Sequence, residues 1–171
     1  MAEPTRNIPA PVPFIHLKVH SAYSLLEGAL PVSKLAKLAV GYGYPALGLT
    51  DTNNLFGALE FSEKLAAEGV QPILGTSVDI DFGDMTGTSN PLMRTVSNSP
   101  RAGVAGRIAL FAKDAEGYAN LMKLSRVLYF DPAPDEPAHI KIARLEEASG
   151  GLIALTGGPL GPIDKALKDE Q

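Results

Sequence analysis

The sequence predicts an α/β fold in which parallel strands alternate with helices. Residues 45–50 and 71–80 carry short apolar runs typical of buried strands, and residues 14–20 alternate apolar and polar side chains. Segments with apolar residues at helical spacing separate these strands. Strand–helix alternations of this length are typical of βαβ units, whose strands lie parallel in one sheet.

The first half of the chain gives the clearest pattern. In the strand predicted at 14–20, the polar residues His16, Lys18 and His20 share one face. A helix follows from Pro31, which suits a first helical turn, and stops at Gly41 and Gly43. A second helix comes between the strands at 45–50 and 71–80. Its predicted apolar stripe consists of Leu55, Leu59 and the segment from Phe61 to Leu65.

Two segments depart from this pattern. Residues 83–106 are mostly Gly, Ser, Thr, Asn and Pro, and loops of this length are usually functional or mobile, so we expect a mobile loop insertion. Residues 1–13 are rich in proline, and we expect a flexible N-terminal segment. The ordered domain is therefore predicted to span residues 14–171, interrupted by the loop.

Order resumes with a strand at 107–112 and a helix capped by Asp114. One face of this helix is apolar, and we expect it to pack in the core rather than bind a partner; it consists of Tyr118, Leu121, Leu124 and Leu128. A proline-rich connection at 130–139 leads to a short helix, and a strand at 151–156 precedes the final helix. The count of predicted strands is about five.

Composition excludes several classes of function. The chain of 171 residues has no cysteine, which excludes disulfide scaffolds, cysteine-ligated metals and thiol catalysis. Its formal net charge of −4 argues against direct binding to a phosphate backbone. It has neither an apolar run long enough for a membrane helix nor the pattern of a signal peptide, so we expect a cytoplasmic protein without membrane contact.

Polar side chains gather where the predicted strands end, which is where parallel α/β folds carry their sites. These residues are Lys18, His20, Glu27, Asp51, Thr52, Ser77 and Asp79. Imidazoles and carboxylates that converge there can hold Zn, Mn or Fe. The alternative is that the histidines are polar positions on a half-exposed strand and that Asp51 is a turn or helix-cap residue.

The blocks HLKVHSAYSLLEGA, PALGLTDTNNLFGALEF, QPILGTSV, LFAKDAEGYANLMKLSR and GLIALTGGPLG resemble, in this order, the N-terminal PHP domain of bacterial DNA polymerase III alpha subunits. The resemblance implies a distorted seven-stranded (β/α) barrel at the front of a longer DNA-directed DNA polymerase, a nucleotidyltransferase of DNA replication. A closed barrel runs beyond about 200 residues. We therefore expect an incomplete PHP-type barrel with parallel strands, truncated from a longer chain.

In metal-binding members of this family, the barrel holds up to three metals and can act as a phosphoesterase or proofreading nuclease. The resemblance implies a degenerate form of that site here. The first family motif, His-x-His, falls on Lys18 and His20, and the family's aspartate falls on Glu27. Two further ligand positions, a histidine and a glutamate, fall on Thr52 and Ser77. A third histidine position falls on Arg107.

Only His20 and Glu27 remain as metal ligands in this comparison, and no catalytic residue is expected. An ammonium has no lone pair for a metal, so we expect the cations to pair with Glu27 and the remaining acids. No cofactor is expected; Mn, Zn or Mg would bind only if the remnant site were occupied. The segment by itself is expected to be inactive as an enzyme.

The resemblance implies a non-catalytic scaffold that stabilises the rest of the polymerase alpha chain and docks a separate proofreading exonuclease subunit. The alternatives are a metal-dependent PHP phosphoesterase or 3′–5′ exonuclease, and a stand-alone binding module that reuses the barrel fragment. An incomplete barrel also leaves an open sheet edge. We expect either a homodimer through that open side or an exposed apolar patch.

Overall fold

The computed structural model describes residues 13–82, 106–134 and 136–169. The helices are α1 (Val32–Gly41), α2 (Ala58–Ala67), α3 (Ala115–Phe130), α4 (Ile142–Glu147) and α5 (Pro162–Asp169), with a 3₁₀ turn η1 at Gly158–Leu160. The strands are β1 (Ala46–Leu49), β2 (Gln71–Asp81), β3 (Gly106–Ala112), β4 (Ile140–Lys141) and β5 (Leu152–Leu155). The segments predicted as flexible, 1–13 and 83–106, lie outside the described residues except for Pro13 and Gly106, and Gly106 begins β3.

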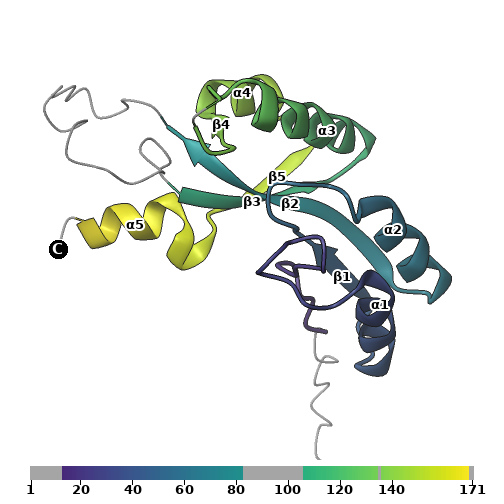
Figure 1. The fold of residues 1–171 in the computed structure, drawn as a ribbon. Helices are drawn as coiled ribbons and strands as arrows, with labels where there is room; N and C mark the ends of the chain where they lie inside the picture. The colour runs from purple at the N-terminus through teal and green to yellow at the C-terminus, as the bar shows by residue number, and fades with distance from the viewer. Residues whose placement is uncertain (1–12, 83–105, 135, 170–171) are drawn as a thin grey trace, which may run out of the picture.

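The strands form one mixed sheet that does not close into a barrel (Figure 1). Its order is β1-β2-β3-β5, with β4 beside the end of β2. Strand β2 lies parallel to β1 and β4, whereas β3 lies antiparallel to both β2 and β5. Among the described strands, β3 alone therefore runs in the reverse direction. The α/β class and the incomplete barrel are confirmed, but the expectation of parallel strands throughout is wrong for β3.

The reversal has a physical basis in the sequence between β2 and β3. A parallel pair needs a crossover connection, usually a helix, whereas an antiparallel pair needs only a returning chain. Residues 83–106 carry no helical pattern. The absence of that pattern was a signal for an antiparallel pair.

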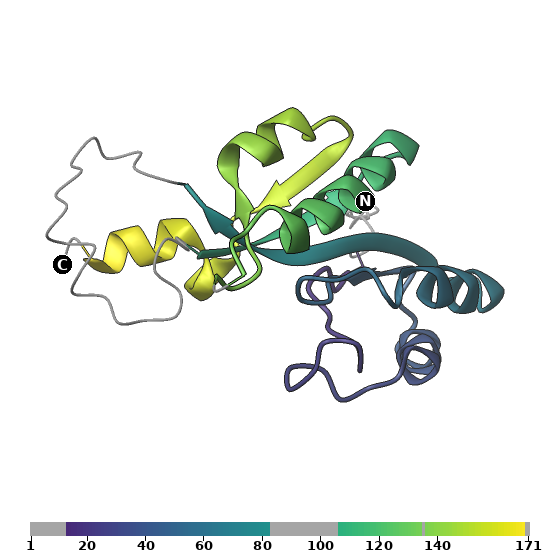
Figure 2. The same ribbon diagram turned by 45° about the horizontal axis from the view of Figure 1, so that its top comes forward.

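Two hydrophobic clusters hold the sheet and the helices together. The first packs α1 and α2 against β1 around Leu35, Leu47 and Phe61. The second packs α3 and α4 over β2, β3 and β4 around Ile80 and Leu124. Figures 1 and 2 show the two groups at different parts of the long strand β2, with α5 near β3 at the far end. The long strand β2 thus links the two halves of the domain.

The N-terminal segment does not form the strand predicted at 14–20. It lies beside β1 through two hydrogen bonds, from the Gly48 amide to the His16 carbonyl (2.8 Å) and from the Thr50 amide to the Val19 carbonyl (2.8 Å). The two chains approach so closely that a Cβ on Gly48 would lie 2.5 Å from the carbonyl oxygen of Leu17. Glycine is required there because only its bare backbone fits the crossing.

The predicted helices form with one correction. In α3, the Asp114 side chain accepts a hydrogen bond from the Gly117 amide (2.9 Å), which confirms the predicted cap. Leu121, Leu124 and Leu128 of its predicted apolar face are buried; Tyr118 is half-buried. In α2 the predicted stripe was wrong at Leu59, which is 68% exposed. The buried side chains of α2 are Ala58, Phe61 and Leu65.

Strand β5 has one neighbour among the described strands, β3, and its other edge is open. Its apolar side chains Ile153 and Leu155 are half exposed. Separately, none of the helices in the described part of the chain is long and apolar enough to cross a membrane.

Candidate functional site

The candidate site lies where the reversed strand β3 meets the end of β2. Because β3 is antiparallel, its second residue, Arg107, is paired in register with Asp79 near the C-terminal end of β2. The N-terminal segment and the loop after β1 reach the same end of the sheet, bringing Glu27 and Thr52 to Arg107. The antiparallel direction of β3 therefore places the guanidinium of Arg107 in this site.

The guanidinium of Arg107 binds two carboxylates. Its Nε and Nη2 donate to the two oxygens of Asp79, at 3.0 and 3.4 Å, and its Nη1 donates to Oε1 of Glu27 at 2.8 Å. The Arg107 side chain is only 12% exposed. Burial opposes its charge, but the hydrogen bonds and charges of Asp79 and Glu27 outweigh burial and raise the pKa of Arg107. The side chain is thus a fixed cation.

Both oxygens of Glu27 are occupied by donors. Oε1 accepts from Arg107, and Oε2 accepts from the Thr52 hydroxyl at 2.5 Å. Arg107 Nη1 also lies 3.4 Å from the Thr52 hydroxyl, so the three side chains touch one another. Burial by itself raises the pKa of Glu27, but the hydrogen bonds from Thr52 and Arg107 outweigh it and lower that pKa. Glu27 is therefore held ionised.

His20 lies at the side of this group. Its Nδ1 is 3.5 Å from the Thr52 hydroxyl, 3.4 Å from the Ser24 hydroxyl and 3.9 Å from Oε2 of Glu27. Burial lowers the pKa of His20, and the attraction of Glu27 and Asp51 only partly opposes this. The imidazole is therefore mainly neutral at pH 7.

Asp51 is buried, and its carboxylate binds Ser21 and Ser24 rather than the guanidinium of Arg107. Its carboxylate accepts from the Ser21 amide (2.6 Å), the Ser21 hydroxyl (2.7 Å) and the Ser24 hydroxyl (2.6 Å). The Ser24 hydroxyl in turn accepts from the Thr52 amide at 3.0 Å. The turn that carries Glu27 is thereby fixed to the end of β1. Ser21 and Ser24 were not predicted as site residues, although they lie one and four residues after His20 in the sequence.

Two predicted positions lie outside the cluster of contacts. Lys18 donates to the backbone carbonyl of Gly157 at 3.4 Å, and its predicted ion pair with an acid is not seen among the described residues. Ser77 lies inside β2, where its backbone pairs with Thr52. The Ser77 hydroxyl is fully buried and has no hydrogen-bond partner within the described part of the chain.

The structure therefore brings together four of the predicted positions, His20, Glu27, Thr52 and Arg107, and adds Asp79 to them. The sequence predicts Asp79 as a polar residue of its strand and not as a member of the remnant site. The missing signal was the register, because Asp79 and Arg107 face each other only if β3 is reversed.

The donor set does not fit the metal cluster of the resembled family. Among the described residues, no group of three or more His, Asp or Glu side chains is arranged to hold a metal. A catalytic metal usually needs about three protein ligands and an open position. His20 and Glu27 are near each other, but Glu27 already accepts hydrogen bonds from Thr52 and Arg107.

Comparison with known proteins places this chain in a family. Residues 16–171 match the family model of the PHP domain. The chain is 41% identical to the DNA polymerase III subunit alpha of Caulobacter vibrioides over 88% of its own length, and 39% identical to that of Aquifex aeolicus over 84%. It spans about 12% of the length of each of these relatives.

Among solved structures, an amidohydrolase from Chromobacterium violaceum is similar over 66% of this chain and 34% of its own, with a TM-score of 0.43 and 21% sequence identity. The sequence resemblance to the PHP domain of DNA polymerase III alpha subunits is confirmed by the family model and by the relatives. The chain belongs to the PHP domain family.

Proposed function

We propose that this PHP domain is a non-catalytic scaffold of a DNA polymerase III alpha subunit, in which a bound guanidinium replaces the metals of the family's site. The observation that carries the proposal is the position of Arg107 between Glu27 and Asp79. A buried cation bound to two carboxylates supplies the positive charge that a metal supplies elsewhere. It also repels a metal ion from the same place.

The hydrogen-bonding pattern supports this reading over a site that has merely lost a ligand. Both oxygens of each carboxylate accept hydrogen bonds. Glu27 accepts from Arg107 and from Thr52, whereas both oxygens of Asp79 accept from Arg107. Such a closed arrangement satisfies polar groups that would otherwise be costly to bury. These contacts connect the N-terminal segment, β2 and β3 to one another, and a scaffold requires such connections.

Calorimetric titration of the 171-residue chain with Mn²⁺ and with Zn²⁺ tests the proposal. We expect no stoichiometric binding. A control variant restores the family's residues with Lys18→His, Thr52→His, Ser77→Glu and Arg107→His, and we expect it to gain affinity for metal if it folds, as checked by circular dichroism. Stoichiometric, sub-micromolar binding by the unmodified chain would overturn the proposal.

The competing function is that of a metal-dependent phosphoesterase or 3′–5′ exonuclease, and the proximity of His20 and Glu27 is the observation that favours it. A colorimetric phosphatase assay with added Mn²⁺ separates the two functions. We expect no Mn²⁺-dependent release of phosphate. Activity that disappears in a Glu27→Gln variant would establish the enzyme instead.

The partners in this proposal are the rest of the polymerase alpha chain and a proofreading exonuclease subunit. The relatives support the first, because this domain corresponds to about 12% of each alpha subunit. The exonuclease enters through the family resemblance, and titration of the full alpha chain with that subunit tests it. Deleting this domain from the alpha chain should abolish the binding, and undiminished binding would remove docking from the proposal.

The open edge of β5 belongs to the same proposal. Ile153 and Leu155 are half exposed there, and an unpaired strand edge can pair with another chain. We propose that a second copy or the rest of the alpha chain covers this edge. Sedimentation should show self-association of the isolated chain, or else the fluorescence of a hydrophobic dye should show that the chain binds it. A clean monomer that binds no dye would contradict this part.

A further inference from the structure

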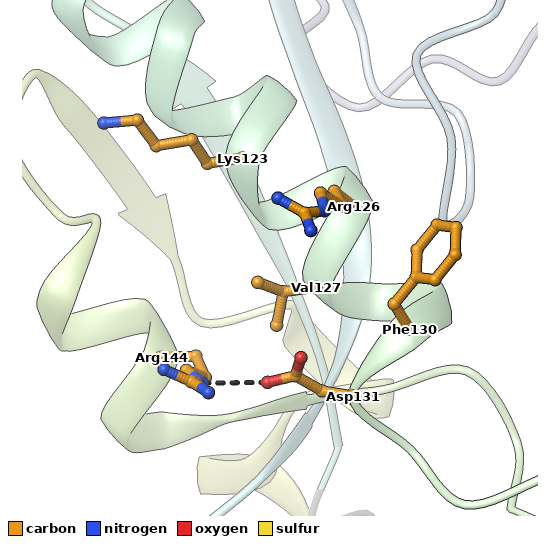
Figure 3. A pocket seen from close by; sticks show the side chains of 6 residues that line it. All are labelled: Lys123, Arg126, Val127, Phe130, Asp131 and Arg144. Carbon is orange, nitrogen blue, oxygen red and sulfur yellow. Dashed lines mark hydrogen bonds and ion pairs between the residues drawn. The ribbon is translucent and has the colours of Figure 1, made fainter.

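A pocket of about 310 Å³ lies beside α3 and α4, outside the candidate site. Figure 3 shows its lining: the α3 residues carry two cations and two apolar side chains, and Arg144 reaches from α4 to the residue after α3. The lining residues are Lys123, Arg126, Val127, Phe130, Asp131 and Arg144. None of them takes part in the contacts of Arg107 and Glu27.

The three cations of the pocket are not equivalent. Arg144 is committed, because its Nε binds Asp131 at 2.8 Å and its Nη1 binds Glu147 at 3.0 Å. Lys123 donates to the uncharged side-chain oxygen of Asn120 at 3.0 Å and has no carboxylate partner in the described ranges. Arg126 has neither a hydrogen bond nor an ion pair with any residue that the structure describes.

Two cations thus remain uncompensated in a chain whose formal net charge is −4. They lie three residues apart on one helix, so their side chains extend from neighbouring turns of the same face. Local positive charge on an acidic protein attracts anionic groups. Because Lys123 and Arg126 line the pocket, we expect an anionic group to bind there.

Two apolar side chains, Val127 and Phe130, also line the pocket. Phe130 is 80% exposed, although a phenylalanine gains most when it is buried. Phe130 also lies four residues after Arg126, on the adjacent turn. Interfaces favour such aromatic side chains next to arginine, because the ring supplies contact area and the guanidinium supplies specificity.

We propose that this pocket binds an acidic peptide segment of a partner protein, in which carboxylates flank an apolar side chain. The carboxylates pair with Lys123 and Arg126, and the apolar side chain packs on Val127 and Phe130. The proposal rests on the pocket alone and does not depend on the proposed polymerase role. It assigns a binding surface by its chemistry, without a named partner.

Nucleic acid fits the pocket less well than a peptide does. Binding a phosphate backbone depends on many cations along a track, whereas only two here lack a carboxylate partner. An acidic peptide can place its few carboxylates at the two cations and its apolar residue at Phe130.

Fluorescence anisotropy with a labelled peptide in which glutamates flank one phenylalanine tests the proposal on the whole chain. The double variant Lys123→Glu/Arg126→Glu should weaken binding by about tenfold or more, and added salt should weaken binding to the unmodified chain. The matched control is Lys34→Glu/Lys37→Glu, with the same charge change and spacing on exposed positions of α1. It should change the affinity by less than about twofold.

Further arms of the experiment decide between the possible ligands. The variant Phe130→Ala should weaken the peptide binding, and Lys123→Met/Arg126→Met provides a charge-removing variant if the reversal fails to fold. Equal losses in the α1 control, or no loss in either pocket variant, would overturn the proposal. It would also be overturned if single-stranded DNA bound as tightly through the same residues, or if inorganic phosphate displaced the peptide at similar concentrations.

Discussion

Arg107 and Glu27 are 80 residues apart in the sequence, yet Nη1 of Arg107 lies 2.8 Å from Oε1 of Glu27. The same guanidinium binds Asp79 on the neighbouring strand. One side chain thus connects the N-terminal segment, β2 and β3.

Replacing Arg107 by methionine should lower the free energy of unfolding by about 2 kcal/mol, because Glu27 and Asp79 would keep their charges without a partner. Arg107→Lys should recover only part of this loss, since an ammonium cannot reproduce the fork of a guanidinium. Urea unfolding measures both. The control is Arg144→Met, which also removes an arginine bound to two carboxylates, but one that is 48% exposed. It should cost less than about 1 kcal/mol. Equal losses at the two positions would contradict the role of burial.

The variant Asp51→Ala should destabilise the domain by about 3 kcal/mol, because Ser21 and Ser24 would leave buried donors unsatisfied. Asp51→Asn should cost less, since it keeps an acceptor oxygen. The change Glu63→Gln on the exposed face of α2 serves as the comparison and should stay within about 0.5 kcal/mol. Thermal or urea unfolding provides the measurement. An Asp51→Ala variant as stable as Glu63→Gln would show that this carboxylate does not hold the turn.

Removing the cap of α3 with Asp114→Ala should cost about 1 kcal/mol, because the Gly117 amide loses its side-chain acceptor. Asp114→Asn should retain most of the stability, since asparagine caps nearly as well. The comparison of the two unfolding midpoints separates the cap from general effects of substitution. If asparagine were as damaging as alanine, the contribution would have to come from the negative charge.

Stability should fall in two stages as the pH is lowered. The pKa of His20 in the folded state lies below the ordinary 6.5, so protonation favours the unfolded chain and stability is lost as the pH falls through 6.5. The pKa of Glu27 lies below the ordinary 4.5, so its contribution is complete above 4.5 and is lost as the pH falls further towards the folded-state pKa.

Variants assign these two stages to their residues. His20→Gln should flatten the dependence of the unfolding free energy on pH in the upper range, and Glu27→Gln should flatten it in the lower range. Glu27→Gln should also reduce stability at neutral pH, because Arg107 loses a carboxylate. Unfolding curves over a series of pH values measure each effect. A His20→Gln variant with an unchanged upper stage would refute the assignment.

Much of the fold was predictable because it depends on local signals. Asp114 was recognised as a cap, and Leu121, Leu124 and Leu128 as a buried face, from spacing along the chain alone. Leu59 was misplaced because a stripe of apolar residues does not tell which side meets the core. The strand predicted at 14–20 does not form, because this segment contacts β1 through only a few hydrogen bonds, at the place where it passes close to Gly48. The alternation of polar and apolar residues does not reveal how many hydrogen bonds a segment makes.

The candidate site divides between sequence and tertiary structure in the same way. By itself, the sequence determined the residue types at the predicted site positions, among them Arg107, Thr52 and Ser77, and its composition excluded cysteine chemistry. Only the tertiary structure decided which of them meet. The direction of β3 is set by pairing with a distant strand, and this pairing places Arg107 opposite Asp79 and within reach of Glu27. A reversed strand carries its first residues to the end where its neighbours finish, and no local pattern of side chains encodes that geometry.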